Sequence, residues 1–529
     1  MPAVPRPVSV AARHGALGMA AANPDLPRSA AGPNSPWLLA VIVSIATFME
    51  VLDTTIANVA LRHIAGSLAA SQDESTYVIT SYLVSNAIVL PISGWLSNVI
   101  GRKRFYMICV GLFTISSVAC AFATSLPMML LFRVLQGVGG GGLAPTEQSI
   151  FADSFTPKQR ALAFSLYGFT IVTAPAIGPV LGGWLTDSFS WHWVFLINLP
   201  VGALSLILTW LFVYDSPLVQ QERATLIAKG LRLDYFGFLL IILGFGSLQI
   251  VLDRFEREDG FSSTLIVVLS IVCVVSLVTL VVWELVHDQP VMNLRLLKVP
   301  AFSISCVIMF MFGFIIVSTT QLLPQLTQEL LGYDATTAGL TLGVGGFLTL
   351  FIMPLAGVVT GRLIQPRWLV FSALCGTAGA LHYASGLNLE ISFFNASLSR
   401  VIQVIWLPFI FIPLSAVQFT GVPPGKNPDA SAIINLMRNL GGSWGVSVAT
   451  TELAWRSQFH TARLSEHITP YNGYGWGVPL GQIARAVREQ ATILSYLDVF
   501  TVLSLIALSV APLALFLPNV QKGAAAGGH

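Results

Sequence analysis

Charged residues are scarce in this chain of 529 residues, because Asp, Glu, Lys and Arg together make up only 10% of it. Soluble globular proteins carry about 25% charged residues, so the composition excludes that class. Hydrophobic residues make up 54%, which indicates a protein whose main solvent is lipid. The 27 basic and 25 acidic side chains nearly cancel, so no electrostatic footprint for nucleic acid is present either.

Cysteines are also few, and their positions predict neither a disulfide nor a metal site. All five lie inside apolar runs, without a CxxC spacing or a nearby histidine cluster. The sequence contains no HExxH motif and no phosphate-binding P-loop, so neither metal-dependent hydrolysis nor coupling to ATP is indicated. We therefore expect no catalytic residues, no metal and no cofactor, and any transport would draw its energy from an ion gradient.

Apolar segments long enough to cross a bilayer recur along the chain. A bilayer core needs roughly 20 apolar residues per helix, and charged or Pro/Gly-rich stretches separate about fourteen such segments. The expected spans are 37–61, 76–98, 104–124, 127–150, 160–185, 193–214, 233–252, 264–286, 301–323, 336–361, 368–386, 397–419, 431–455 and 497–518. Most Lys and Arg side chains outside them lie in segments that would be cytoplasmic if the N-terminus is inside, so we expect both termini to be cytoplasmic.

A short internal repeat suggests how these helices are grouped. Residues 91–94 and 101–102 read Pro-Ile-Ser-Gly and Gly-Arg, while residues 354–357 and 361–362 read Pro-Leu-Ala-Gly and Gly-Arg. The repeat relates the second helix to the tenth, as two parallel six-helix halves separated by two extra helices would do. Ordinary Pro and Gly punctuation at helix ends explains it equally well. The expected regions are a disordered cytoplasmic tail (1–35), an N-terminal half (36–215), two linker helices (216–290), a C-terminal half (291–520) containing a long outer loop (456–496), and a cytoplasmic tail (521–529).

Two carboxylates in the first span are the strongest candidates for chemistry. Glu50 and Asp53 are spaced i, i+3, so they share one helix face, which must look into a protein cavity because ionisable groups are costly in lipid. At 1.5 Å per residue, Asp53 lies roughly 24 Å from the inner face and Arg133 roughly 9 Å from the outer face, which puts both in the outer part of the core. We expect Arg133 to face these acids, and protonation of Asp53 to weaken the attraction. A static ion pair that only fixes helix packing is the alternative.

Three further ionisable residues lie within spans. Glu147 and Arg438 both fall in the cytoplasmic part of the core, where they could pair as a gate, or Arg438 could extend toward the interface instead. Arg400 lies near the outer start of its span, and we expect it to extend toward the interface as well.

The fifth span is rich in proline and glycine. Pro175 and Pro179 remove backbone donors, while Gly178 and Gly182 allow a neighbouring helix to approach, so a kinked and closely packed helix suited to a rocking interface is expected. A substrate would bind near the midplane between the halves, against aromatic and amide side chains. The residues assigned to that role are Gln249, Gln321, Gln325 and Trp406.

Several strings together resemble one family. Residues 48–61 resemble the helix 1 signature of the fourteen-helix drug:proton antiporters of the major facilitator superfamily, EmrB type. Gly94-Trp95-Leu96 followed by Gly101-Arg102-Lys103-Arg104 is similar to the superfamily's motif between helices 2 and 3. Arg133 with Gln136-Gly137 resembles its helix 4 motif, and residues 178–183 resemble the helix 5 motif associated with antiport.

The resemblance implies an all-α membrane protein of the major facilitator fold, with Asp53 in proton coupling, Arg133 in proton relay and the fifth helix as a hinge-like contact. It also implies export of amphipathic compounds, with a periplasmic HlyD-type adaptor and an outer-membrane channel as partners. One position departs from the family pattern, because the acid normally found four residues after Gly94 is Asn98 here. This absence puts a gating role of the loop containing Gly101 and Arg102 in doubt.

The sequence thus predicts a proton-coupled multidrug efflux antiporter of the bacterial inner membrane that works by alternating access. An exporter dedicated to a native metabolite, fatty acid or siderophore is one alternative. A membrane sensor or scaffold that transports nothing is another, although a scaffold would not need a costly pair of intramembrane carboxylates.

Overall fold

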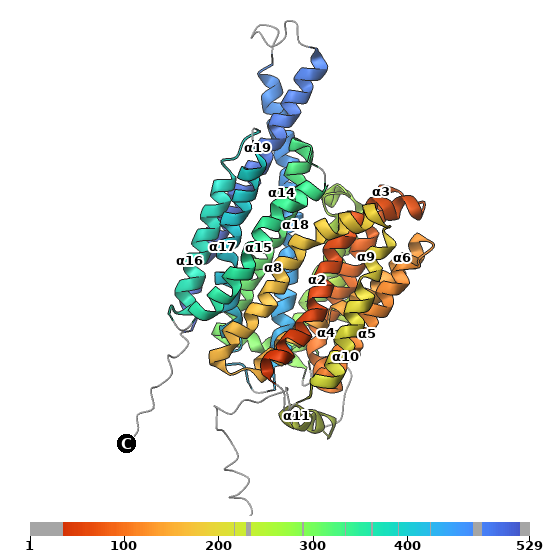
Figure 1. Ribbon diagram of the computed structural model, residues 1–529, viewed down its shortest axis with the longest axis vertical. Helices are drawn as coiled ribbons and strands as arrows, with labels where there is room; N and C mark the ends of the chain where they lie inside the picture. Colours follow the sequence, from red (N-terminus) through yellow and green to blue (C-terminus); the bar gives the residue numbers. More distant parts are fainter. Residues whose placement is uncertain are drawn as a thin grey trace, which may run out of the picture.

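The computed structural model describes residues 35–215, 217–228, 234–287, 290–333, 335–360, 363–389, 391–423, 425–468 and 479–518. Its secondary structure within these ranges is helical, apart from an isolated bridge between Thr360 and Ile364 (Figure 1). The expected tails lie outside the described residues, except for Ser35 at the end of the first one.

The helices fall into three sets along the chain. The N-terminal helix group consists of α2 (Pro36–Ser67), α3 (Gln72–Ser75), α4 (Tyr77–Ile100), α5 (Arg102–Ala121), α6 (Leu126–Gly140), α7 (Leu143–Ser154), α8 (Pro157–Ser188), α9 (His192–Leu196) and α10 (Asn198–Phe212). Next come α11 (Pro217–Ala228), α12 (Tyr235–Arg254) and α13 (Thr264–Val286). The C-terminal helix group consists of α14 (Pro300–Leu331), α15 (Ala335–Val359), α16 (Pro366–Ala384), α17 (Phe393–Val417), α18 (Asn427–Glu466) and α19 (Leu480–Val510).

Helix starts and ends follow local chemistry. Proline occupies the first position of α2, α8, α14 and α16, where the missing N–H costs nothing and the fixed φ suits a helix. Gly101 separates α4 from α5 with φ = 97°, and Gly332 ends α14 with φ = 66°. Both glycines adopt a left-handed conformation that L residues with a side chain rarely tolerate.

Each expected span contains helix, but fewer helices than fourteen meet a strict test of length and hydropathy. Eleven helices in the described part of the chain are long and apolar enough to cross a membrane, or twelve when the bent α8 is counted as one span. Neither α16 nor α18 is among them, and α18 carries buried polar residues that lower its hydropathy. The chain is therefore a multi-pass membrane protein, and the count of fourteen stays a prediction.

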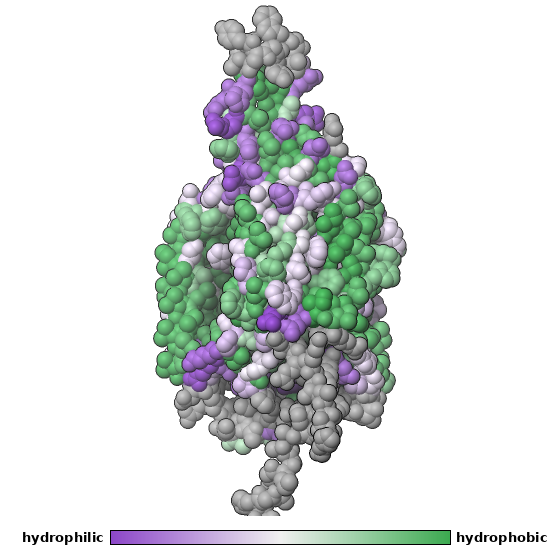
Figure 2. All heavy atoms as spheres, turned by 90° about the vertical axis from the view of Figure 1, so that its left-hand side faces the viewer, coloured by the Kyte–Doolittle hydropathy of each residue, from purple (hydrophilic) through white to green (hydrophobic). Residues whose placement is uncertain are grey.

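The surface agrees with a bilayer environment. Figure 2 shows wide hydrophobic areas on the sides of the helical body, while hydrophilic residues gather toward its two ends. Helix α13 contributes several exposed aliphatic side chains to the outside of the body, among them Val274, Val278 and Val282. Such a continuous apolar exterior is expected of a protein surrounded by lipid.

One end of the molecule carries a projection where a loop was expected. Helix α18 continues to Glu466 and α19 begins at Leu480, so the prediction of a loop over 456–496 is wrong for most of its length. In Figure 1 these blue helices rise beyond the rest of the bundle at the top. We call this the upper end, and the opposite end, where α11 lies, the lower end. The prediction failed because hydropathy locates the membrane rather than the ends of a helix.

The two helix groups pack through α8 and α18. Helix α8 packs against α2 on one side and α15 on the other, while α18 packs against α14, α4 and α7. Within the C-terminal helix group, glycines bring α14 and α18 together, since a Cβ at Gly441 would collide with the carbonyl of Phe310 and one at Gly313 with that of Arg438. The expected bend in α8 is present, with its segments Gln159–Pro175 and Ile177–Ser188 inclined by 45°.

Candidate functional site

A fully buried ion pair joins α2 to α6. Arg133 donates from Nη1 to Asp53 Oδ2 at 2.8 Å, and the two residues are 0% and 1% exposed. Asp53 Oδ1 accepts two further bonds, from Gln136 Nε2 at 3.0 Å and Asn198 Nδ2 at 2.6 Å. We call these four residues the Asp53 cluster. Its carboxylate accepts three hydrogen bonds, which compensates for the loss of water around a buried charge.

The guanidinium of Arg133 is held on its other sides by α4 and α9. Its Nε donates to the carbonyl oxygen of Val78 at 3.0 Å, and its Cζ lies 4.6 Å from the ring centroid of Tyr82 and 5.7 Å from that of Phe195. Aromatic faces attract a guanidinium electrostatically, so Arg133 is fixed by α4 and α9 as well as by Asp53. A change in charge at Asp53 would therefore affect α6, which carries Arg133, and also α4 and α9, which contact its guanidinium.

Glu50 shares the helix face of Asp53 but has different partners. The hydroxyl of Tyr82 donates to Glu50 Oε1 at 2.8 Å, and Asn86 Nδ2 lies 3.4 Å from the same oxygen. Glu50 makes no ion pair with Lys or Arg in the described part of the chain. Tyr82 thus contacts Glu50 with its hydroxyl and Arg133 with its ring, which links the two acids.

A row of polar contacts, which we call the polar seam, connects α18 to α4, α7, α8 and α12. Asn439 Nδ2 donates to Asn86 Oδ1 at 3.3 Å, next to Glu50. Further along α18, Asn435 Oδ1 accepts from Tyr167 at 3.1 Å and from Gln148 at 3.3 Å. Contacts of this kind can exchange partners when packed helices shift, because hydrogen bonds between neutral side chains are individually weak.

Glu147 and Arg438, expected either to form a gate or to leave Arg438 at the interface, do neither in this conformation. Ser44 donates to Glu147 Oε1 at 2.6 Å, whereas Arg438 Nη1 donates to the hydroxyl of Tyr167 at 2.6 Å. Arg438 points into the polar seam, with its Cζ 5.7 Å from the Tyr167 ring centroid. Glu147 thus bonds Ser44 and Arg438 bonds Tyr167, and the two charged groups form no ion pair with each other within the described ranges.

At the lower end, the two helix groups are joined. Asn98 Nδ2 donates to Asp429 Oδ1 at 2.9 Å, and Asn427 Nδ2 donates to Asp153 Oδ1 at 2.8 Å. Arg102 forms an ion pair with Asp153. We call these five residues the lower latch. The family pattern's acid is absent at position 98, and Asp429 of α18 places a carboxylate against Asn98 instead.

Two glycines shape the latch region. A Cβ at Gly94 would lie 2.9 Å from both the Cα of Asp429 and the carbonyl oxygen of Pro428, so the missing side chain lets α4 touch α18. Gly101 turns the chain into α5, where the backbone N–H of Lys103 donates to Asp215 Oδ1 at 3.0 Å. The loop between α4 and α5 is therefore tied to the segment after α10.

The Pro/Gly segment of α8 lies between α2 and α15. A Cβ at Gly178 would collide with the side chain of Thr55, and one at Gly182 would lie 3.1 Å from Ile56 Cγ2. On the other side, Pro179 Cβ lies 3.2 Å from where a Cβ of Gly339 would stand. Pro175 ends the first straight part of the helix. This segment thus contacts both helix groups.

The four residues expected to bind substrate have different partners, although Gln321 and Gln325 are neighbours on α14. Gln249 is buried and accepts from Ser443 at 3.0 Å, so it belongs to the polar seam. Gln321 is exposed, Gln325 donates to Glu329 at 3.0 Å, and Trp406 packs against Gly376 of α16. No hydrogen bond joins any two of these four in the described part of the chain, and their role in substrate binding stays a prediction.

The expected position of Arg400 is also wrong. Its side chain is 5% exposed and points to Thr319 and Gln403 inside the C-terminal helix group, instead of reaching the interface.

Residues 441–445 spell a GxSxG string, yet they lie inside α18, whereas a nucleophile elbow needs a turn between a strand and a helix. Ser443 of this string donates to Gln249.

Sequence reasoning gave no role to Tyr82, Asn86, Asn198, Tyr167 and Asn435, although all five are central to the contacts described above. Each is a polar residue inside an apolar span. That signal could have found them, since buried polar groups need hydrogen-bond partners and therefore gather.

Comparison with known proteins places this arrangement in a family. The model of the Major Facilitator Superfamily matches residues 43–446. The multidrug export protein EmrB of Escherichia coli (strain K12) is 35% identical over 510 residues, covering 93% of this chain and 97% of that protein. The fatty acid resistance protein FarB of Neisseria gonorrhoeae is 34% identical, covering 92% of this chain and 97% of that protein.

The fold agrees with these sequence relatives. The crystal structure of the human organic anion transporter MFSD10 superimposes with a TM-score of 0.60 at 16% identity, covering 91% of this chain and 99% of that one. At such low identity the similarity concerns the fold alone. The chain belongs to the Major Facilitator Superfamily and, within it, to the family of EmrB-like transporters.

Proposed function

We propose that this protein is a proton-driven exporter of amphipathic compounds in the bacterial inner membrane, which works by alternating access and performs no covalent chemistry on its substrate. The observation that carries the proposal is the Asp53 cluster, in which a carboxylate and a guanidinium are paired out of reach of solvent. Ionisable groups inside a membrane protein are costly to maintain and mark ion or proton pathways. The relatives named for multidrug export and for fatty acid resistance support amphipathic substrates.

Proton binding at Asp53 would act through charge. A charged Asp53 holds Arg133 as an ion pair, while a protonated Asp53 loses the charge–charge attraction to the guanidinium and can no longer accept at every site that now bonds it. Tyr82 contacts both Arg133 and Glu50, so a shift of the guanidinium reaches Glu50 and then Asn86 and Asn439 of the polar seam. Protonation thereby changes the contacts between the two helix groups.

The proposed cycle opens the two ends of the molecule in turn. The lower latch joins α4 to α18 and so closes the lower end in this conformation. We infer that protons enter from the upper, outer side and leave at the lower, cytoplasmic side after the latch opens. Because the proposed exchange is an antiport, substrate moves the opposite way as the two helix groups alternate in access. We propose that the two halves that alternate in access are residues 36–215 and 291–520.

We further propose that the protein works with a periplasmic HlyD-type adaptor and an outer-membrane channel, as the resemblance to EmrB-type antiporters implies. The projection formed by α18 and α19 at the upper end supports this arrangement, because it extends past the other helices (Figure 1). Purification of the protein with a tagged adaptor, with and without residues 456–490, tests this part separately.

Proton release from energised everted vesicles tests the proposed function. A pH-sensitive dye reports the response to a panel of lipophilic cations, uncouplers and fatty acids, for wild type, Asp53→Asn and Asp187→Asn. Asp187 is an exposed carboxylate near the end of α8, so its variant controls for the loss of one acid. We expect several compounds to release protons in wild type and in Asp187→Asn, and none in Asp53→Asn.

Other outcomes separate the alternatives. Full drug-driven proton release by a folded Asp53→Asn protein would refute the role of Asp53. A response to one fatty acid or metabolite, with no response to drugs, would instead indicate a dedicated exporter. Binding of ligands without transport under an imposed pH gradient would indicate a sensor or scaffold.

A further inference from the structure

The C-terminal helix group repeats the hydrogen-bonding pattern of the Asp53 cluster. Arg400 and Gln403 of α17 are spaced i, i+3, as are Arg133 and Gln136 of α6. Arg400 Nη1 donates to Gln403 Oε1 at 2.9 Å, just as Arg133 Nη1 donates to Gln136 Oε1 at 2.8 Å. In both places the Arg and the Gln also bond a common side chain on a neighbouring helix.

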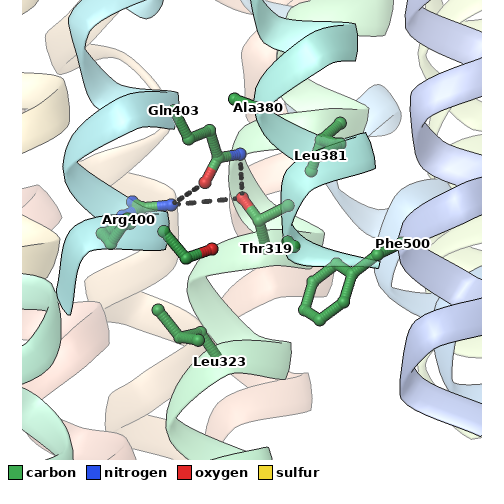
Figure 3. Close-up of a pocket in the computed structure, with 9 residues that line it drawn as sticks. Thr319, Leu323, Ala380, Leu381, Arg400, Gln403 and Phe500 are labelled. Carbon is green, nitrogen blue, oxygen red and sulfur yellow. Dashed lines mark hydrogen bonds between the residues drawn. The ribbon is translucent and has the colours of Figure 1, made fainter. Parts of the chain in front are cut away.

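That common side chain differs in charge between the two groups. Asp53 accepts from both Arg133 Nη1 and Gln136 Nε2. Its counterpart is Thr319 of α14, whose Oγ1 lies 3.2 Å from Arg400 Nη1 and 2.8 Å from Gln403 Nε2 (Figure 3). A hydroxyl accepts the hydrogen bonds but supplies no negative charge, so the repeat lacks a counter-ion.

The guanidinium of Arg400 is nevertheless buried. Its side chain is 5% exposed, its Nη2 donates to Thr320 Oγ1 at 2.9 Å, and its Nε has no hydrogen-bond partner. No carboxylate within the described ranges forms an ion pair with it. A buried charge left without a partner costs several kcal/mol, so the site favours any anion that can reach it.

Empty space lies beside this group. A cavity of about 10 Å³, enough for about one water molecule, is bordered by Arg400, Gln403 and Thr319 on its polar side, so a larger ligand enters only when the apolar border moves. Its apolar border comes from α14, α16 and α19, and consists of Leu323, Ala380, Leu381, Ala384 and Phe500 (Figure 3). A charged head group next to an apolar wall is the arrangement that an amphipathic ligand requires.

We propose that Arg400, Gln403, Thr319 and Thr320 form an anion-binding site in the C-terminal helix group, which takes the carboxylate of an amphipathic substrate. The guanidinium supplies the donors in a planar fork, while the hydroxyls of Thr319 and Thr320 accept from it and donate to backbone carbonyls of α14. A small inorganic anion such as chloride presents the same chemistry. Transport of such a ligand rests on the proposed function, whereas its binding does not.

Equilibrium binding to the purified full-length protein in detergent tests the site. Radiolabelled decanoate is compared with decyltrimethylammonium, which has the same tail and the opposite charge, in a buffer free of chloride. We expect saturable binding of decanoate and weaker binding of the cation. If added chloride displaces decanoate and chloride itself binds, the site is assigned to inorganic anions. Binding of decanoate that chloride does not displace would assign it to the substrate head group.

A matched pair of variants isolates the charge. Thr319→Asp places a carboxylate where Asp53 stands in the other group, so it fills the site internally, while Thr319→Asn has the same shape without the charge. We expect Thr319→Asp to weaken decanoate binding by about tenfold or more, since a charge-assisted contact is lost, and Thr319→Asn to weaken it less, since its amide adds no charge. Thr319→Asp should also raise the unfolding temperature, which excludes misfolding as the cause.

Variants of the arginine complete the test. Arg400→Gln should lose anion binding, Arg400→Lys should keep part of it, and Arg456→Gln, on the exposed projection, should bind like wild type. The inference is overturned if wild type binds decanoate no better than the cation, or if Thr319→Asp binds it as wild type does. Anion binding without proton-coupled export refutes the proposed function alone, and export without anion binding refutes this site alone.

Discussion

Removing either partner of the ion pair between Asp53 and Arg133 should destabilise the protein, and removing both should cost less than the sum of the two single losses. Both residues are fully buried, and Arg133 has no other carboxylate partner in the described part of the chain. Removing one partner of a buried pair costs about 3–5 kcal/mol, because the other charge is left uncompensated. We therefore expect this loss for Asp53→Asn and for Arg133→Gln alike.

The double variant carries no charge at either position. Its two amides can bond each other and also Gln136 and Asn198, so its loss of stability should be smaller than the sum of the single losses by about 2 kcal/mol or more. Unfolding of the purified proteins in mixed micelles, followed by circular dichroism, measures the four free energies. Asp187→Asn combined with Arg133→Gln serves as the control and should be additive. Additivity of the Asp53 and Arg133 variants within about 0.5 kcal/mol would refute a coupled buried pair.

Three further substitutions test other contacts. Asn98→Asp places a second carboxylate against Asp429 and should open the lower end, measured as faster alkylation of a cysteine introduced there. The double variant Asn98→Asp with Asp429→Asn restores an amide–carboxylate pair and should close that end again. Unchanged alkylation in Asn98→Asp would contradict the latch. Gly178→Val forces a side chain against Thr55 and should lower the unfolding temperature by several degrees, for a cost of about 1–3 kcal/mol; an unchanged melting curve would show that α2 and α8 are not closely packed there. Tyr82→Phe removes the hydrogen bond to Glu50 but keeps the aromatic ring against Arg133. It should therefore alter the pH dependence of export with little loss of stability. An unchanged pH profile would argue against a link between Glu50 and Asp53.

The contact between Asp53 and Arg133 was accessible from the sequence because depth in a bilayer can be counted along a helix. Helix rise and bilayer thickness are constants, so two ionisable residues at similar depth in neighbouring spans have few other places to find a partner. The same constants located each helix, since lipid demands long apolar segments. The resemblance then indicated how the helices are grouped.

Residues whose partners depend on rotation about the helix axis were predicted less well. Depth alone placed Arg400 near an outer helix end, but which face of α17 looks inward is decided by packing against α14, and there Arg400 meets Thr319. Arg438 points into the polar seam and Glu147 precedes Gln148 of that seam in α7, yet Tyr167 and Ser44 take their hydrogen bonds. Neutral polar partners like these carry no charge pattern that a sequence reveals.

The latch illustrates the same limit. Asn98 breaks the family pattern within α4. Only the contact between Asn98 and Asp429, which are 331 positions apart in sequence, shows that Asp429 provides the acid. The projection at the upper end was missed for a different reason. Its residues are polar, and a helix outside the membrane leaves no mark in hydropathy.

Substrate-induced proton release by the purified protein tests the central claim most directly. Wild type, Asp53→Asn and Asp187→Asn are placed in weakly buffered detergent solution with a pH indicator, and a transported compound is added. Coupling through the Asp53 cluster predicts that substrate binding releases protons from wild type and Asp187→Asn, and none from a folded Asp53→Asn protein. Equal proton release by Asp53→Asn and wild type would contradict it.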